Sequence, residues 1–214
     1  MPNWCFNSLT IKGKSNDVKE MFGLQRNDNL EDFLHNNYVS LRTWFPMPQT
    51  FCDVDTVNSK CKRDDKNLET QMPLFNSDEE YEEYSRKYDE AVEYQRSTYG
   101  VVGWYYYNIL TLGTKWDSCL NERNDFQGDT FSYSELDDVI SVNFHFDTAW
   151  AAPLPWYDQM VEKFSNISFS MECEEEFGLF HFLIEYDAET RNIRTTELEL
   201  PDWDDESVYD NYSE

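Results

Sequence analysis

The chain has 214 residues, of which 40% are apolar and 17% are aromatic. This composition is sufficient for a packed core and excludes a wholly disordered chain. The chain also carries 43 acidic and 17 basic side chains, which gives a formal net charge of −26. Such a surplus of carboxylates disfavours direct binding to nucleic acid or to an anionic membrane surface.

The first part of the chain predicts a strand, a helix and a second strand. Residues 7–12 alternate between apolar and polar side chains, as a half-buried strand does. Ser15 is predicted to be the N-cap of a helix that ends near Gly23. A helical turn is expected at residues 30–34, and a second strand is expected at residues 39–44, before two prolines interrupt regular structure.

A helical acidic insertion is predicted at about residues 49–99. Residues 49–77 are polar and weakly periodic, so they are expected to be partly irregular. From Ser77 the chain reads SDEEYEEYSRKYDEAVE, in which acidic residues occupy a predicted first helical turn and tyrosines recur at helical spacing. We therefore predict a helix at residues 78–99. Its tyrosine stripe is interpreted as core-facing, with an exposed aromatic binding surface as the alternative.

The remaining pattern predicts mostly strands. Residues 139–146 show the clearest alternation, and a helix is expected to begin at Pro155 and end near Phe164. The other strands are expected at residues 104–116, 167–172, 179–186 and 193–200. Short connections between strands favour an antiparallel sheet with helices on one face. We predict one ferredoxin-like α+β domain over residues 1–200, with the insertion described above and an acidic tail at residues 201–214.

The cellular compartment is predicted from the N-terminal residues and the cysteines. The first residues show neither a basic segment nor an apolar segment of the kind found in secretion signals, and no apolar stretch is long enough to span a membrane. The five cysteines are odd in number and lack C-x-x-C spacing, so reduced thiols in the cytoplasm are expected. They are Cys5, Cys52, Cys61, Cys119 and Cys173.

The excess negative charge is confined to the later part of the chain. Residues 1–66 carry nine basic and nine acidic side chains, so the whole net charge of −26 belongs to residues 67–214. Solubility, a specific interface for a basic partner, and cation binding all remain possible uses of these carboxylates. If there is an interface, its predicted residues are Asp78, Glu79, Glu80, Glu82, Glu83, Asp89, Glu90, Glu93, Glu174, Glu175 and Glu176.

No catalytic or metal-binding motif is recognisable, so we predict no enzyme activity, no catalytic residues, no metal and no cofactor. The sequence contains no phosphate-binding glycine loop, no G-x-S-x-G and no H-E-x-x-H. His145 and His181 fall on predicted strands and could meet in space, although ordinary strand histidines are the simpler interpretation.

One candidate pocket rests on carboxylates that lie beside indoles near strand ends. Its residues are Trp4, Trp116, Asp117, Asp147 and Trp150. Two carboxylates brought close together would raise the pKa of one of them, and aromatic walls with a few polar groups are typical of small-molecule sites. The alternative is structural: both aspartates cap turns and the tryptophans fill the core.

Three short motifs resemble one known family. The first is the opening MPNWC with Asn7 and Leu9–Ile11, the second is GTKWD at 113–117, and the third is FDTAW at 146–150 followed by Pro153. These motifs are similar to those of the YubB-like ferredoxin-like domain proteins of phages and plasmids. The resemblance spans about residues 1–186. It implies a ferredoxin-like fold and a mobile-element origin, but no reaction and no catalytic positions. The acidic insertion and the acidic tail depart from that family's pattern.

These observations lead to two functional hypotheses. The first is an acidic, phage- or plasmid-type interaction protein that binds and inhibits a basic, nucleic-acid-binding host protein, such as a defence component, by imitating DNA. The second is a small-molecule-binding protein or enzyme that uses the aromatic and carboxylate pocket.

Overall fold

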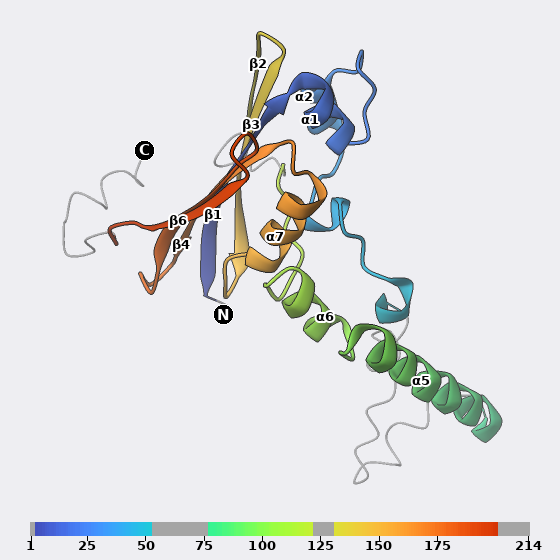
Figure 1. Cartoon of the computed structure of the whole chain (residues 1–214). Helices are drawn as coiled ribbons and strands as arrows, with labels where there is room; N and C mark the ends of the chain where they lie inside the picture. Colours follow the sequence, from blue (N-terminus) through green and yellow to red (C-terminus); the bar gives the residue numbers. More distant parts are fainter. Residues whose placement is uncertain (1–2, 53–76, 122–130, 201–214) are drawn as a thin grey trace.

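A computed structural model of the chain describes residues 3–52, 77–121 and 131–200, and these form an α+β fold around one antiparallel sheet (Figure 1). The sheet has six strands in the order β2-β3-β1-β4-β5-β6. Their bounds are Trp4–Lys14 for β1, Phe131–Leu136 for β2, Val139–Ala149 for β3, Ser168–Glu175 for β4, His181–Asp187 for β5 and Asn192–Glu197 for β6.

The chain path is that of a ferredoxin-like domain with two additions. Helices α1 (Ser15–Met21) and α7 (Leu154–Lys163) complete a β1-α1-β2-β3-α7-β4 unit. Its four strands lie in the order β2-β3-β1-β4, as expected for a split β-α-β arrangement. The hairpin β5-β6 extends the sheet beyond β4, and the insertion lies between α1 and β2. The predicted ferredoxin-like α+β fold is confirmed.

Strand alternation separates a buried face from a face that no described helix covers, which we call the uncovered face. On β3, Ile140, Val142, Phe144 and Phe146 are buried, as the sequence pattern predicts. Figure 1 shows that α1, α2 (Leu30–Asn36) and α7 lie on the same side of the sheet. Helix α7 contributes fully buried Trp156 and Tyr157 to this core. The other face of the sheet carries mainly polar side chains.

The predicted acidic helix is confirmed as α5 (Asp78–Tyr99). Its bounds follow from local chemistry: the Ser77 side chain accepts a hydrogen bond from Glu80 N at 3.2 Å, and Gly100 ends the helix in the left-handed conformation at φ 75°. In Figure 1, α5 points away from the sheet and is joined to it through α6 (Trp104–Thr111). Most of the irregular segment predicted before α5 lies outside the described residues, as does the predicted tail.

Two predicted strands are wrong. Residues 39–44 contain a 3-10 helix, Leu41–Thr43, and residues 104–111 form helix α6. Aromatic and β-branched residues favour strands, but tertiary contacts decide these segments. Tyr107 of α6 stacks on Phe51 at 4.3 Å, and the Arg42 guanidinium donates hydrogen bonds to Asn108 Oδ1 and, at 3.1 Å, to Thr111 Oγ1. These contacts need one helical face and would be lost in an extended chain.

Two further details differ from the sequence prediction. Strand β2 was not predicted, because its exposed polar residues lie at the sheet edge and give a weak apolar pattern. Ser15 is not the N-cap of α1, since Lys14 occupies that position. The Ser15 hydroxyl instead donates to Glu135 Oε1 at 2.6 Å and ties α1 to β2. In the part of the chain that the structure describes, no helix is long and apolar enough to cross a membrane.

Candidate functional site

The acidic residues of α5 gather on one side of the helix. At about 100° per residue, five of them fall within about 100° of the helix circumference and so share a face: Glu79, Glu82, Glu83, Glu90 and Glu93. All five are exposed. Exposed Glu80 and Asp89 flank this group, and only the backbone of Asp78 is described. We call the seven exposed acidic residues from Glu79 to Glu93 the α5 acidic face.

The opposite side of α5 carries the tyrosine stripe. Tyr81, Tyr84 and Tyr88 are half-buried there and Gln95 is fully buried, whereas Tyr94 lies toward the α5 acidic face and is 53% exposed. Gln95 anchors the C-terminal end of the helix, because its amide donates to Thr50 O at 2.7 Å and accepts from Gly103 N at 2.9 Å. The stripe is therefore only half-buried along most of its length and is anchored at its C-terminal end, while the other side of the helix presents carboxylates to solvent.

Three carboxylates of the α5 acidic face are paired within the helix. Lys87 Nζ lies 2.7 Å from Glu83, Arg86 lies 2.7 Å from Glu90, and Arg96 lies 3.3 Å from Glu93. These pairs are solvent-exposed, and such pairs typically contribute less than about 1 kcal/mol. The described side chains of Glu79, Glu82 and Asp89 form no ion pair with another described residue.

The predicted acidic residues of the β4-β5 turn do not form one surface. Glu175 is buried at 1% exposure, and its Oε2 accepts hydrogen bonds from Phe177 N at 2.8 Å and Leu179 N at 3.2 Å. Glu176 accepts from Trp4 N at 3.0 Å, which fixes the start of β1. Glu175 therefore organises the turn from inside and is inaccessible to a partner, while Glu174 and Glu176 remain partly exposed.

Replacing Glu175 with alanine is expected to lower the free energy of unfolding by about 2–3 kcal/mol, because two partly buried backbone N–H groups lose hydrogen bonds to a charged acceptor. Glu174→Ala is a matched control on the neighbouring position, and we expect it to stay within about 0.5 kcal/mol of wild type. Urea denaturation followed by circular dichroism measures both. Equal losses in the two variants would contradict the structural role of Glu175.

The three predicted pocket tryptophans lie in one cluster, in which two of them contact a lysine of the chain itself. The Trp4 and Trp116 ring centroids lie 6.3 Å apart. Lys115 Nζ lies 4.5 Å from the Trp116 ring centre and 5.0 Å from that of Trp150. Trp116 and Trp150 are 38% and 51% exposed. The cluster is thus a half-exposed surface in which an ammonium group contacts two indole faces.

The two predicted aspartates lie beside this cluster without acting as a pair. Asp117 Oδ1 accepts hydrogen bonds from Arg42 N at 3.2 Å and Ser118 N at 3.0 Å, so it caps a turn. The Ser118 hydroxyl donates to Asp147 O at 2.7 Å. Partial desolvation on the uncovered face raises the pKa of Asp147, although much of its surface meets solvent. The cause of this raised pKa is desolvation and not a second carboxylate, so it gives no support to a coupled carboxylate pair.

His145 and His181 do not meet. Both lie on the uncovered face, but β1 and β4 separate their strands. His181 Nε2 lies 2.7 Å from Glu172 Oε1, and its Nδ1 lies 2.7 Å from Glu199 O. Among the described residues, no group of three or more His, Cys, Asp or Glu side chains is placed to hold a metal ion.

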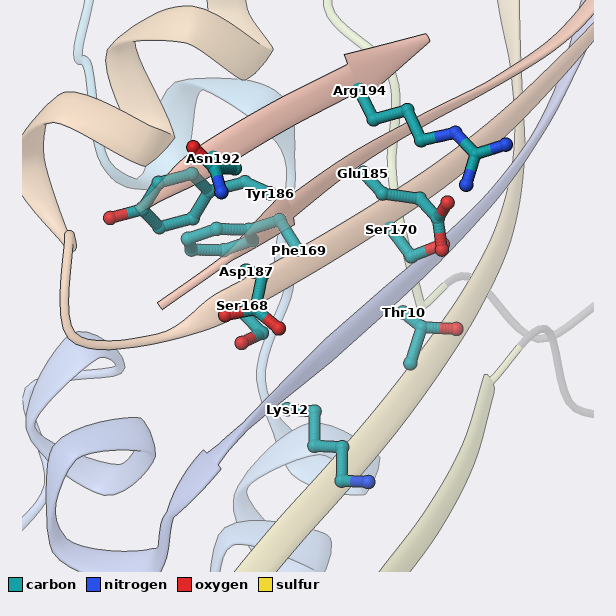
Figure 2. A pocket seen from close by; sticks show the side chains of 10 residues that line it. All are labelled: Thr10, Lys12, Ser168, Phe169, Ser170, Glu185, Tyr186, Asp187, Asn192 and Arg194. Carbon is teal, nitrogen blue, oxygen red and sulfur yellow. The ribbon is translucent and has the colours of Figure 1, made fainter. Parts of the chain in front are cut away.

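A separate hollow of about 380 Å³ lies on the uncovered face (Figure 2). It extends over β1, β4, β5 and β6, and both basic and acidic side chains surround its hydroxyl-bearing floor. Its lining residues are Thr10, Lys12, Ser168, Phe169, Ser170, Glu185, Tyr186, Asp187, Asn192 and Arg194. None of the five predicted pocket residues is among them. The alternation of polar residues in each strand was visible in the sequence, but the strand order that joins them was not.

The comparisons with known proteins concern the C-terminal part of the chain most directly. Residues 115–210 match a family model described as a ferredoxin-like domain in Api92-like protein. Among solved structures, the crystal structure of protein Api92 from Yersinia pseudotuberculosis is similar, with 10% sequence identity and a TM-score of 0.43 over 95% of this chain and 100% of that chain. No curated protein matches. Residues 115–210 are therefore similar to the ferredoxin-like domain of Api92-like proteins, and the fold of the chain is ferredoxin-like.

Proposed function

We propose that the protein binds a basic, nucleic-acid-binding protein through the α5 acidic face and thereby blocks the partner's access to nucleic acid. The observation that carries this proposal is a 22-residue helix that points away from the sheet and exposes seven carboxylates along its length (Figure 1). Electrostatic attraction between a negative surface such as this one and a positive surface on the partner speeds their association and fixes their relative position.

The spacing of these carboxylates supports imitation of a nucleic acid. Glu93 lies fourteen positions after Glu79, a rise of about 21 Å along a helix. Seven carboxylates over this length correspond to about one charge per 3 Å, close to the spacing of about 3.4 Å along one DNA strand. The three internal ion pairs reduce this charge, but exposed pairs are weak enough for a basic partner to replace them.

The kind of partner follows from the same proposal. It is a host protein with a basic groove for nucleic acid, such as a component of a defence system, met in the cytoplasm by the product of a phage or plasmid. Its arginine and lysine side chains take the place of the counterions on α5. No cofactor takes part, because the inhibition is competition for one surface.

The proposal is tested by capture with the full chain as bait in lysate of its host cells. A basic protein should be retained at about 0.1 M salt and released at about 1 M salt, where the screening length falls to about 3 Å. The captured protein should bind duplex DNA by itself, and added duplex DNA should displace it from the bait.

Variants then locate the surface. The triple variant Glu79→Gln, Glu82→Gln, Asp89→Asn should weaken binding by about tenfold or more, because it removes three charges from the contact. The control Glu20→Gln, Asp158→Asn, Glu162→Gln removes three exposed charges elsewhere and should have little effect. Equal weakening by both variants, or a captured protein that does not compete with DNA, would count against α5 as the binding surface.

A further inference from the structure

The hollow on the uncovered face has a floor of short hydroxyl side chains between charged walls (Figure 2). Thr10 pairs with Ser170 across β1 and β4, and Lys12 pairs with Ser168. Neighbouring strands lie about 4.8 Å apart, so short side chains on adjacent strands leave a depression beside longer ones. The Thr10 hydroxyl accepts a hydrogen bond from Asn143 Nδ2 at 2.9 Å and that of Ser168 accepts from Ala188 N at 3.0 Å, so each of these two hydroxyls keeps its own hydrogen for a ligand acceptor.

The charges that surround this floor are balanced and unpaired. Two basic side chains, Lys12 and Arg194, face two acidic ones, Glu185 and Asp187. Glu185 lies directly opposite Arg194 in the β5-β6 register, a position from which opposite charges commonly pair. Within the described residues, however, no ion pair involves Lys12, Glu185 or Arg194. Their charges therefore remain available to a ligand.

One wall of the hollow is held in place by the β5-β6 turn. Asp187 Oδ1 accepts hydrogen bonds from Glu189 N at 2.9 Å, from Thr190 N at 2.7 Å and from the Thr190 hydroxyl at 3.0 Å. These bonds lower the pKa of Asp187, so its carboxyl group is ionised at neutral pH. Ser168 Oγ accepts from Ala188 N at 3.0 Å. A wall fixed in this way loses little freedom when a ligand binds.

We propose that this hollow binds a small zwitterion of the α-amino acid class. The ligand ammonium group contacts the carboxylates of β5, Glu185 and Asp187. The ligand carboxylate contacts Arg194 or Lys12, which lie on opposite sides of the hollow in Figure 2. A guanidinium group can bind a carboxylate through two parallel hydrogen bonds, and the floor hydroxyls satisfy the remaining polar atoms.

The balance of charge selects this class of ligand over simpler ones. An anion such as phosphate would approach Lys12 and Arg194 but would be repelled by the two carboxylates between them. A cation would be attracted by Glu185 and Asp187 but repelled by Lys12 and Arg194. A molecule with both charges satisfies both sets of groups, and a hollow of about 380 Å³ has room for one amino acid.

The experiment titrates the full chain with glycine, L-alanine, L-glutamate and L-lysine by calorimetry and by NMR. At least one should bind saturably, and its N-acetylated and amidated forms should bind at least about tenfold more weakly, since each lacks one charge. Inorganic phosphate is titrated in parallel. If none of the four amino acids saturates at about 10 mM, the proposal is wrong.

Substitutions of charged residues around the hollow test separately the group that binds the ligand carboxylate and the group that binds the ligand ammonium. Arg194→Gln and Glu185→Gln should each weaken the amino acid about tenfold or more. Arg191→Gln and Glu189→Gln, which change the same residue types outside the hollow, should leave binding unchanged. All four positions lie in the exposed β5-β6 hairpin, so circular dichroism should show folded variants. Phosphate binding that Glu185→Gln strengthens, without amino acid binding, would replace the proposal with a plain anion site.

Discussion

Replacing Trp156 with alanine is expected to lower the free energy of unfolding by about 3–5 kcal/mol, the range found when a fully buried large aromatic side chain is removed. Trp156 of α7 is 0% exposed and its ring centroid lies 5.9 Å from that of Trp44. Its Nε1 also donates to Leu41 O at 3.0 Å. The substitution therefore opens a cavity and leaves a buried carbonyl without its donor, which costs about 1–3 kcal/mol more if water cannot reach it.

This prediction has two matched comparisons within the chain. Trp156→Phe retains most of the packing and loses the hydrogen bond, so an intermediate loss is expected. Trp150→Ala removes the same side chain from a half-exposed position and should cost less than about 1 kcal/mol. Denaturation followed by far-ultraviolet circular dichroism avoids dependence on tryptophan fluorescence. A similar cost for Trp150→Ala and Trp156→Ala would show that the core is not centred on α7.

Replacing Gly113 with alanine is expected to be nearly as damaging, at about 3 kcal/mol. Gly113 has φ 80°, where L-residues are strained by about 1–2 kcal/mol. An added Cβ would also lie 2.4 Å from Pro155 Cδ and 3.3 Å from Ala152 O. Gly113 therefore fixes how closely the end of α6 approaches the start of α7.

Gly23→Ala separates the two contributions to this cost. Gly23 has φ 75°, but nothing lies within 4 Å of its added Cβ. We expect a loss of about 1 kcal/mol from the backbone conformation alone. Thermal and urea denaturation measure the loss of unfolding free energy in Gly113→Ala and in Gly23→Ala. The difference between the two losses is the cost of the clash with Pro155. If Gly113→Ala costs no more than Gly23→Ala, the close approach of α6 and α7 is not constrained by this glycine.

Local patterns predicted the elements in which one face is consistently apolar. The alternation at residues 139–146 predicted β3, and the serine, the acidic first turn and the tyrosine spacing predicted α5. The same rules failed at residues 104–111, where WYYYNILT has strand-like composition but forms a helix. There the contacts of Tyr107 with Phe51 and of Asn108 with Arg42 join segments distant in sequence. No local pattern contains that information.

The sequence alone determined the class of this protein: an acidic α+β chain with a long acidic helix and no recognisable catalytic motif. These properties depend on composition and on periods of two or 3.6 residues, which short stretches of chain specify. Only the tertiary structure decided which carboxylates are accessible, since Glu175 is buried while Glu79 is exposed. Only strand order brought Lys12 and Arg194 to one hollow, because pairing between distant strands follows from burial of the whole core and not from any single segment.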